Sequence, residues 1–249
     1  MNQDAAPSGI RPWSERRALI TGASSGIGQA TALAMLRAGA TVVVTGRRLD
    51  RLESLRYAAS DPGRLVAIPG DVDDTDFLAD LSERAGLVDV LVNTAGVLKH
   101  TPFLEGDAKV WEQMWRTNVQ SVLCLTQLVA RGMVERKSGH IVNISSILAS
   151  RVFPYSMVYA STKFAIRAIS QGLRLELREH GIKVTEVAPG QVKTEIFRDE
   201  LHPLVAASYK GRTFAPLVAE DVAAAVLVAT SVPYDVGIDV IEINPRGQG

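Results

Sequence analysis

Short apolar runs alternate with longer amphipathic stretches along this chain of 249 residues. The apolar runs are rich in Val, Ile and Leu, as buried strands are, and the stretches between them have helical spacing. The pattern predicts seven strands, near residues 17–22, 41–46, 64–69, 88–93, 139–145, 182–188 and 238–243. Strands that alternate with helices form parallel sheets through right-handed crossovers. We therefore predict an α/β fold, a doubly wound sandwich with a seven-stranded parallel sheet and helices on both faces.

The chain shows no internal repeat, low-complexity run or composition shift that would mark a linker. Its length suits one α/β domain with a large core. Residues 1–16 are polar, contain Pro7, Gly9 and Pro12, and are predicted to be a flexible tail. Residues 17–249 are then one domain, in which about 190–217 is the only long irregular segment.

A glycine-rich turn follows the first predicted strand, with the sequence Thr21-Gly22-Ala23-Ser24-Ser25-Gly26-Ile27-Gly28. Glycine lets the backbone turn sharply and approach a ligand closely. The helix that begins near Ile27 would point free N–H groups at an anion. Such a turn can also be a plain loop, but a strand before it and a helix after it favour a Rossmann-type pyrophosphate site.

A second pattern lies far downstream, where Tyr159 and Lys163 are one helical turn apart. A positive charge close to a phenol lowers its pKa toward the range in which proton transfer is efficient. The pair is a candidate acid/base for a carbonyl or alcohol. Taken alone it could equally decorate the solvated face of an ordinary helix.

Together with Asn93-Thr94-Ala95-Gly96, Asn118 and the paired serines Ser145-Ser146, these patterns resemble the single-domain short-chain dehydrogenase/reductase family. The family carries a glycine turn, an Asn-Asn-Ala-Gly turn, a helix asparagine, a serine and Tyr-x-x-x-Lys in this order. The likeness runs from about Arg17 to Pro245.

The resemblance implies the catalytic roles. Tyr159 matches the general acid/base, and Lys163 matches its partner, which also binds the nicotinamide ribose. Ser146 matches the serine that orients the carbonyl, thirteen residues before the tyrosine. Asn118 matches the asparagine that perturbs a long helix and holds a water in a proton relay. Ser145 is then expected to pack at the strand end, and Tyr155 to form a wall of the substrate pocket.

The resemblance also implies a set of cofactor contacts. They are Gly22, Ser24, Ser25, Gly26, Ile27, Gly28, Arg47, Arg48, Asp71, Val72, Asn93, Ala95, Gly96, Tyr159, Lys163, Pro189, Gly190, Val192 and Thr194. Asp71 could instead cap the helix that begins near Asp74. In relatives, the segment 190–217 is a mobile lid over the substrate, and its mixture of apolar and basic residues suits either an apolar substrate or a carboxylate.

The end of the second predicted strand bears on the choice of cofactor. Gly46 stands where relatives that prefer NAD carry an aspartate, and Arg47 and Arg48 follow it. Guanidinium groups bind a 2′-phosphate well, so NADP(H) is favoured over NAD(H). The alternative is that both arginines face solvent with Asp50 and Glu53 as local partners.

Composition narrows the function further. Lys and Arg number 27 and Asp and Glu 27, so no net charge draws this chain to nucleic acid or to an anionic membrane. A single cysteine, Cys124, excludes an internal disulfide. We expect a cytoplasmic NADP(H)-dependent oxidoreductase without a metal, which moves hydride between nicotinamide and a carbonyl or secondary alcohol. The resemblance implies dimers or tetramers, because relatives pair their long helices, here around 109–136 and 157–180. The alternative is a regulator or scaffold that binds a dinucleotide without turnover.

Overall fold

The computed structural model describes residues 11–59, 61–197, 201–211 and 213–248. Within these ranges seven parallel strands form one sheet in the order β3-β2-β1-β4-β5-β6-β7. The strands are β1 Arg17–Ile20, β2 Thr41–Gly46, β3 Leu65–Pro69, β4 Val90–Asn93, β5 Gly139–Ile144, β6 Ile182–Pro189 and β7 Val240–Ile243. The α-helices are α1 Gly26–Arg37, α2 Leu49–Ala58, α3 Thr75–Ala85, α4 Ala108–Trp115, α5 Ser121–Arg136, α6 Met157–Leu177, α7 Pro203–Tyr209 and α8 Ala219–Thr230. The predicted Rossmann-type fold is confirmed.

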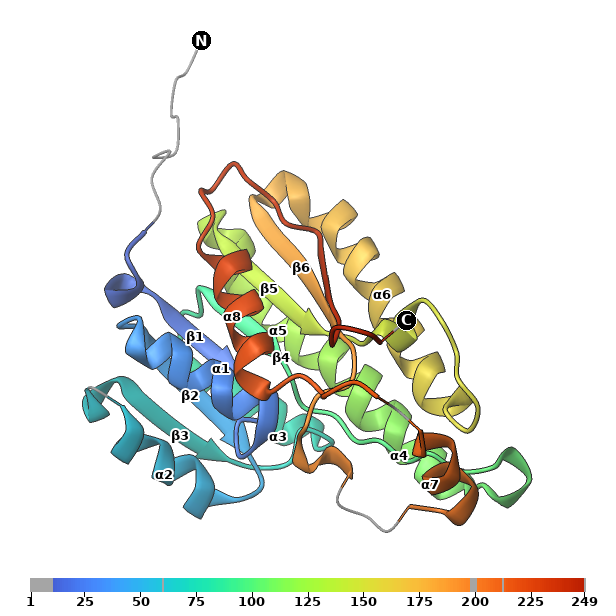
Figure 1. Ribbon diagram of the computed structural model, residues 1–249. Helices are drawn as coiled ribbons and strands as arrows, with labels where there is room; N and C mark the ends of the chain where they lie inside the picture. Colours follow the sequence, from blue (N-terminus) through green and yellow to red (C-terminus); the bar gives the residue numbers. More distant parts are fainter. Residues whose placement is uncertain (1–10, 60, 198–200, 212, 249) are drawn as a thin grey trace.

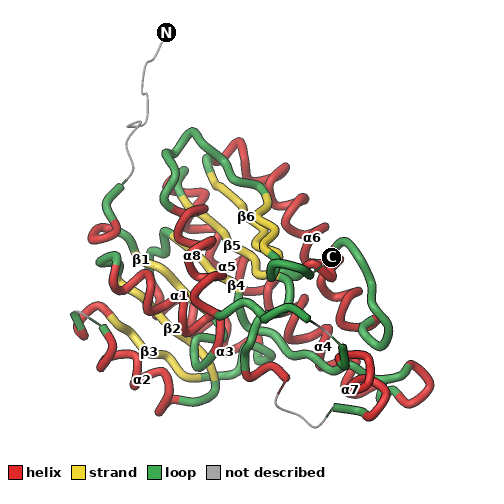
Figure 2. Tube along the Cα trace, viewed as in Figure 1, coloured by secondary structure: helices red, strands yellow, loops and turns green. Residues whose placement is uncertain are grey.

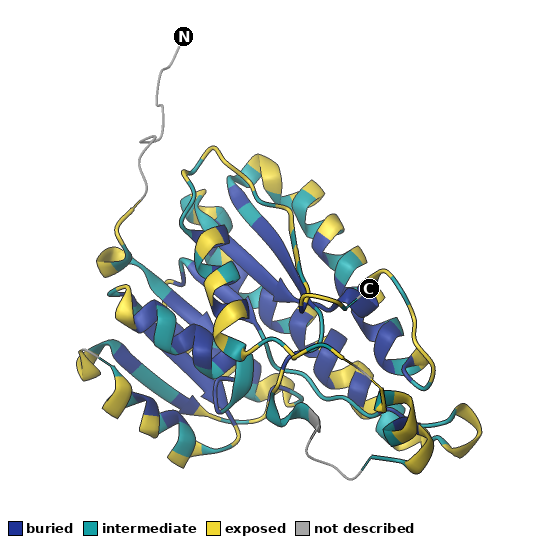
Figure 3. Ribbon diagram, in the orientation of Figure 1, coloured by how far each residue is buried: buried dark blue, intermediate teal, exposed yellow. Residues whose placement is uncertain are grey.

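Helices cover both faces of the sheet, as Figures 1 and 2 show. Side chains alternate between the faces along each strand. Ala18 and Ile20 of β1 therefore pack with α1, α2 and α8, whereas Leu19 between them packs with α3 and α5. The central strands form the buried middle layer, the edge strand β7 is partly exposed, and the exposed residues lie mostly on the outer sides of the helices and in loops (Figure 3). The order of the strands reverses between β1 and β4, where doubly wound proteins bind ligands at the carboxyl ends of the strands.

The helix that precedes β5 is interrupted. After α4 the chain makes a π-helical turn, Arg116–Gln120, and continues directly into α5. Such turns are rare and occur often at functional sites. Asn118 lies in this turn with 1% of its surface exposed. The expected perturbation of a long helix by this residue is therefore present.

The predicted N-terminal tail is too long. Residues 1–10 lie outside the described ranges, but the residues just after them are held against the body of the protein. The Trp13 indole donates to Ser231 Oγ at 3.4 Å, and Arg16 donates to the carbonyl of Thr230 at 2.7 Å. The Arg16 guanidinium also stacks on the Trp13 ring. An aromatic ring and a cation supply this attachment, which the polar composition of the segment obscured.

The segment 190–217 is more regular than predicted. It contains a short 3₁₀ turn, Glu195–Phe197, and the helix α7, whose N-cap His202 accepts from the Leu204 N–H. Residues 198–200 and 212 of this segment lie outside the described ranges. In Figure 1, α7 lies beyond the ends at which the strand arrows finish. The helix therefore stands on the side of the sheet where a ligand would bind.

At the opposite end of the sheet, His140 is buried near the start of β5 and donates from Nε2 to Thr185 Oγ1 at 2.8 Å, since that hydroxyl itself donates to the Ile238 carbonyl. Burial, with a smaller contribution from Lys183 and Arg16, lowers the pKa of His140 to about 3. Between about pH 6.5 and pH 3, His140 is therefore protonated in the unfolded chain but neutral in the folded protein, so the free energy of unfolding decreases as the pH falls through this range.

We expect His140→Gln to flatten the acid side of the stability curve. In the parent protein, His140 should lower the free energy of unfolding by roughly 1 kcal/mol for each pH unit below about 6. Glutamine keeps a hydrogen-bond donor at this position but does not titrate. Urea unfolding between pH 4 and pH 7 measures this, with His180→Gln at a partly exposed histidine as the matched control. Parallel stability curves for the parent protein and His140→Gln would contradict the assignment.

In the described part of the chain, no helix is both long and apolar enough to span a membrane. The same residues contain no group of three or more His, Cys, Asp or Glu side chains placed to hold a metal ion. Cys124 is partly buried against the core on the α3 and α5 face of the sheet.

Candidate active site

A cavity of about 710 Å³ opens at the carboxyl ends of the central strands, beside the glycine-rich turn. Gly22 has a φ of 65°, and a Cβ there would lie 2.8 Å from Ala95 Cα. A Cβ on Gly28 would lie 2.6 Å from the Gly22 carbonyl oxygen. Only glycine fits at these two positions, because the turn packs directly on the β4 loop and on the first turn of α1. The start of α1 therefore faces an open space that suits an anion.

Three arginines gather at one end of this cavity. Arg47 and Arg48 line it, and Arg51 lies one helical turn further along. Arg48 donates to Ser25 Oγ at 2.9 Å and to Ser24 Oγ at 3.1 Å, so it braces the glycine turn. Partial burial, then Arg51 and Arg47, lower the pKa of Arg48. Because these cations repel one another, an anion bound among them would be stabilised.

The anion at this place in the structure is a carboxylate of the chain itself. Glu195 contacts Arg48 at 3.2 Å and Arg51 at 2.8 Å. Glu195 belongs to the segment that leads to α7, so the basic end of the cavity is tied to the segment 190–217. The alternative that both arginines face solvent with Asp50 and Glu53 as partners holds in part. Arg47 is exposed, and Asp50 acts to raise the pKa of Arg48, but Glu53 pairs with Arg56 instead.

A second cavity, of about 390 Å³, adjoins the first. The residues that line both are Ile27, Thr94, Gly96, Leu98, Thr194 and Ile196. Most of its remaining wall is apolar and comes from the loop after β5, from α6 and from α7. The polar groups Ser146, Tyr159 and Lys163 converge on it from β5 and α6.

The Tyr159 phenol is buried in this wall. Its ring lies edge-on to the His100 ring at 6.1 Å, and His100 Nδ1 is 3.0 Å from the Tyr209 hydroxyl of α7. Burial, and to a smaller extent Tyr209, raise the pKa of Tyr159. The predicted lowering of this pKa by Lys163 is therefore wrong in this structure. Desolvation of the phenol outweighs the attraction of an ammonium that lies 5.5 Å from the ring centre.

Lys163 is also buried, and its Nζ donates to the Ile144 carbonyl at 3.0 Å. Burial lowers the pKa of Lys163 to about 8, while Glu186 acts in the opposite direction. The ammonium is thus fixed at the end of β5 rather than free in solvent. It lies on the same face of α6 as Tyr159, as the spacing of the two residues predicts.

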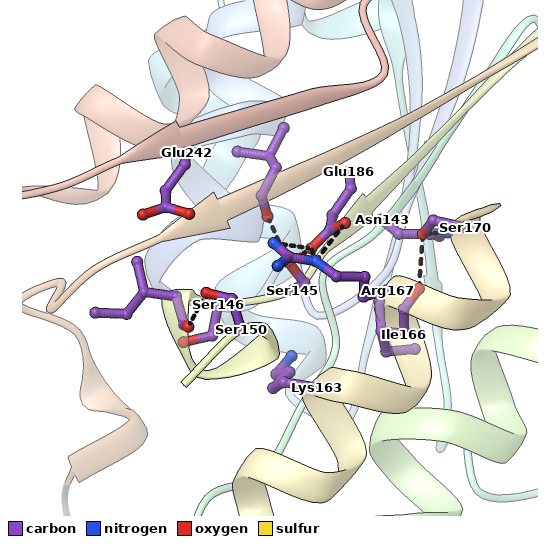
Figure 4. A network of polar contacts seen from close by, with 12 residues as sticks. Asn143, Ser145, Ser146, Ser150, Lys163, Ile166, Arg167, Ser170, Glu186 and Glu242 are labelled. Atoms are coloured by element: carbon purple, nitrogen blue, oxygen red, sulfur yellow. Dashed lines mark hydrogen bonds and ion pairs between the residues drawn. The ribbon is translucent and has the colours of Figure 1, made fainter. Parts of the chain in front are cut away.

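The paired serines serve different partners. Both serines line the second cavity. The Ser146 Oγ accepts from the Leu148 N–H at 3.1 Å, whereas the Ser145 hydroxyl donates at 2.5 Å to Glu186 Oε1 (Figure 4). Because the Ser145 hydroxyl donates to this buried carboxylate, Ser146 is the hydroxyl that a bound substrate would meet, and Ser145 is anchored at the strand end.

Asn118 lines neither cavity in the described part of the chain. Its Oδ1 accepts from the Val97 N–H at 2.8 Å, and its Nδ2 donates to the Val97 carbonyl and to Thr162 Oγ1. The side chain thus joins the loop after β4 to α6. Because these bonds occupy the side chain, a proton relay at this place would have to use the backbone carbonyl of Asn118.

The structure brings most of the predicted cofactor contacts to these cavities. Those that line one or both are Gly22, Ser24, Ser25, Gly26, Ile27, Gly28, Arg47, Arg48, Asp71, Val72, Ala95, Gly96, Tyr159, Lys163, Pro189, Gly190, Val192 and Thr194. Asp74, not Asp71, caps α3.

Besides Asn118, two predicted residues line neither cavity among the described residues. The Asn93 side chain is buried and donates to Thr126 Oγ1 and Asn143 Oδ1, so it ties β4 to its neighbours and does not face a ligand. Tyr155 has a φ of 66°, and Phe153, Pro154 and Ser156 on either side of it line the second cavity in its place.

Sequence reasoning missed three charged residues near the cavities. Arg51 lies one turn after Arg48 on α2, a spacing that was available as a signal. Glu186 is a carboxylate inside an apolar strand, which is unusual enough to mark a special site. Arg167 follows Lys163 by one turn and pairs with Glu186 at 3.1 Å.

The fold and the two joined cavities define a class of protein: a doubly wound α/β protein with an elongated anion-binding cavity beside an enclosed, mostly apolar one. A model of the short chain dehydrogenase family matches residues 16–203. The chain belongs to the short-chain dehydrogenase family and is an oxidoreductase of that family.

Individual relatives agree. The chain is 36% identical over 261 residues to the human dehydrogenase/reductase SDR family member 11, over 98% of this chain and 99% of that protein. It is 37% identical over 243 residues to the glycine betaine reductase ATRR of Emericella nidulans, over 95% of this chain but only 19% of that longer protein. The solved closed form of a serine dehydrogenase complexed with NADP+ matches with a TM-score of 0.83 and 31% identity, over 91% of this chain and 94% of that one.

Proposed function

We propose that this protein is an NADP(H)-dependent oxidoreductase that interconverts a carbonyl and a secondary alcohol. The observation that carries the proposal is the meeting of Ser146, Tyr159 and Lys163 in one cavity, which is continuous with the cavity of the glycine turn. When bound, NADP(H) supplies or accepts the hydride. Everything else in the reaction falls to side chains of this chain.

The residues of the larger cavity fit NADP(H). The N-terminus of α1 suits a pyrophosphate, and Arg47, Arg48 and Arg51 suit the 2′-phosphate. Glu195 already places a carboxylate on two of these guanidiniums, which shows that an anion can be held there. The serine dehydrogenase with the similar fold was solved with NADP+.

At the second cavity, Ser146 orients and polarises the carbonyl oxygen of the substrate and Tyr159 donates the proton to it. The raised pKa of Tyr159 keeps the phenol protonated at neutral pH, as a proton donor must be. In the opposite direction the same phenol, once deprotonated, accepts the proton of the alcohol. Lys163 stabilises that phenolate, and α7 and His100 exclude water.

The substrate that suits this cavity is uncharged. Among the described lining residues Lys163 is the only one that carries a formal charge, and much of the wall is formed by Leu98, Ile147, Leu148, Phe153 and Phe214. Of the two substrate types that the sequence left open, we favour a ketone or aldehyde with apolar substituents over a carboxylate.

Self-association is part of the proposal. Leu123 of α5 and Phe164 and Leu175 of α6 are exposed apolar side chains on the two helices through which relatives pair. A second copy that packs on these helices would cover them.

Titration of the purified protein with NADPH and with NADH, followed by an assay on uncharged ketones, aldehydes and keto acids, tests the function. We expect tighter binding of NADPH and turnover of the uncharged carbonyl compounds. Binding without turnover would instead favour a dinucleotide-binding regulator, and failure to bind either cofactor would refute the proposal.

A further inference from the structure

A buried carboxylate stands behind the wall of the substrate cavity. Glu186 lies on β6, between Thr185 and Val187, with 0% of its surface exposed. A carboxylate in such surroundings is strongly destabilising unless it is paired and hydrogen-bonded. The proposed reaction gives this residue no role.

Both carboxylate oxygens of Glu186 have hydrogen-bond partners. Arg167 Nε donates to Glu186 Oε1 at 3.1 Å and to Oε2 at 3.2 Å, and Arg167 Nη2 lies 3.1 Å from Oε1. Ser145 Oγ donates to the same Oε1 at 2.5 Å. In Figure 4 the arginine reaches from α6 to the strand, and the serine approaches from the end of β5.

Lys163 stands beside this network. It lies one turn before Arg167 on α6, and its ammonium is held by the carbonyl of Ile144, the residue next to Ser145. The titratable and charged groups around it in the described residues are Tyr159 and Arg167 of its own helix and Glu186 of β6. His100 and Tyr209 lie beyond Tyr159 on the far side of the cavity.

We propose that Glu186, oriented by Arg167 and Ser145, is a positioning residue that keeps the Lys163 ammonium charged at the end of β5. A buried lysine loses its proton readily, and burial already brings the pKa of Lys163 to about 8. The nearby carboxylate opposes that loss. The inference rests on the proposed function for the role of Lys163, but not for its charge state.

The two partners of the network should act in opposite directions. Glu186→Gln removes the negative charge but leaves Arg167, so Lys163 should deprotonate at lower pH. Arg167→Gln leaves an uncompensated carboxylate, so Lys163 should deprotonate at higher pH. A role in packing alone would loosen the fold in both variants without moving the titration in opposite directions.

The test is an NMR titration of the full chain with ¹³C-labelled lysine, in which Lys163→Met identifies the signal. We expect the Lys163 midpoint to fall by at least about one pH unit in Glu186→Gln and to rise in Arg167→Gln. Glu242→Gln is the matched control, because this carboxylate is near (Figure 4) but pairs with Arg151. The high-pH limb of kcat/KM should move with each midpoint.

An unchanged midpoint in folded Glu186→Gln would overturn the proposal. If Glu186→Gln fails to fold, Arg167→Gln still tests the proposal through its upward shift, and the charge-conserving Arg167→Lys should stay near the parental midpoint. Equal midpoints in Arg167→Gln and Arg167→Lys would also overturn it. If the midpoints move as expected but the parent protein turns over no carbonyl compound, this inference stands and the proposed function fails.

Discussion

Tyr159→Phe is expected to lower kcat for carbonyl reduction by about 100- to 10,000-fold, the usual contribution of a positioned general acid. The variant keeps the ring that packs against His100 but removes the hydroxyl that would donate the proton. NADPH affinity should change by less than about threefold, because the ring and Lys163 remain. Steady-state kinetics and a fluorescence titration measure the two quantities.

Tyr155→Phe is the matched control for this prediction. It removes the same atom from a residue in the turn just before α6, which does not line the described cavity wall. Its kcat should stay within about twofold of the parental value, as for a surface change away from the site. Parental turnover in Tyr159→Phe would show that another group supplies the proton.

Arg48→Gln is expected to weaken NADPH binding by about 10- to 100-fold, since a hydrogen-bonded charge contact contributes about 1.5–3 kcal/mol. The affinity for NADH, which lacks the 2′-phosphate, should fall much less, so the preference for NADPH over NADH decreases. Adding Arg47→Asp should turn the preference toward NADH. Calorimetry with both cofactors measures the change.

Two further variants help to distinguish two roles of Arg48, binding of the 2′-phosphate and support of the glycine-rich turn. Glu195→Gln removes the carboxylate that contacts Arg48 and Arg51, so NADPH should bind severalfold more tightly than in the parent protein. Arg84→Gln, which breaks an exposed pair with Asp80, should alter neither affinity. An equal loss of NADPH and NADH in Arg48→Gln would mean that Arg48 acts through Ser24 and Ser25.

The sheet could be predicted from sequence because its strands are short apolar runs between turn residues. The segments between successive strands have the apolar spacing of helices, and helical crossovers connect parallel strands. The same reasoning failed where tertiary contacts decide. Trp13 and Arg16 looked like part of a polar tail, but each has a partner near the end of α8. The helix α7 is seven residues long, too short for a periodic signal.

The site was predictable where a motif fixes the backbone, as at Gly22 and Gly28, or where two residues share a helix face, as Tyr159 and Lys163 do. Asn93 shows the limit: the motif gives its position but not the direction of its side chain, which depends on Asn143 of the neighbouring strand. The pKa of Tyr159 shows another, since burial cannot be read from residue spacing.

The wall shared by the two cavities decides which positions can be altered independently. A substitution at Ile196 or Leu98 changes the space available to both ligands at once, so a variant selected for a new substrate would carry an altered cofactor affinity with it. Phe153 and Leu148 line the smaller cavity but not the larger one. Engineering of substrate range is therefore best begun at these two residues, where the demands of the two ligands are separable.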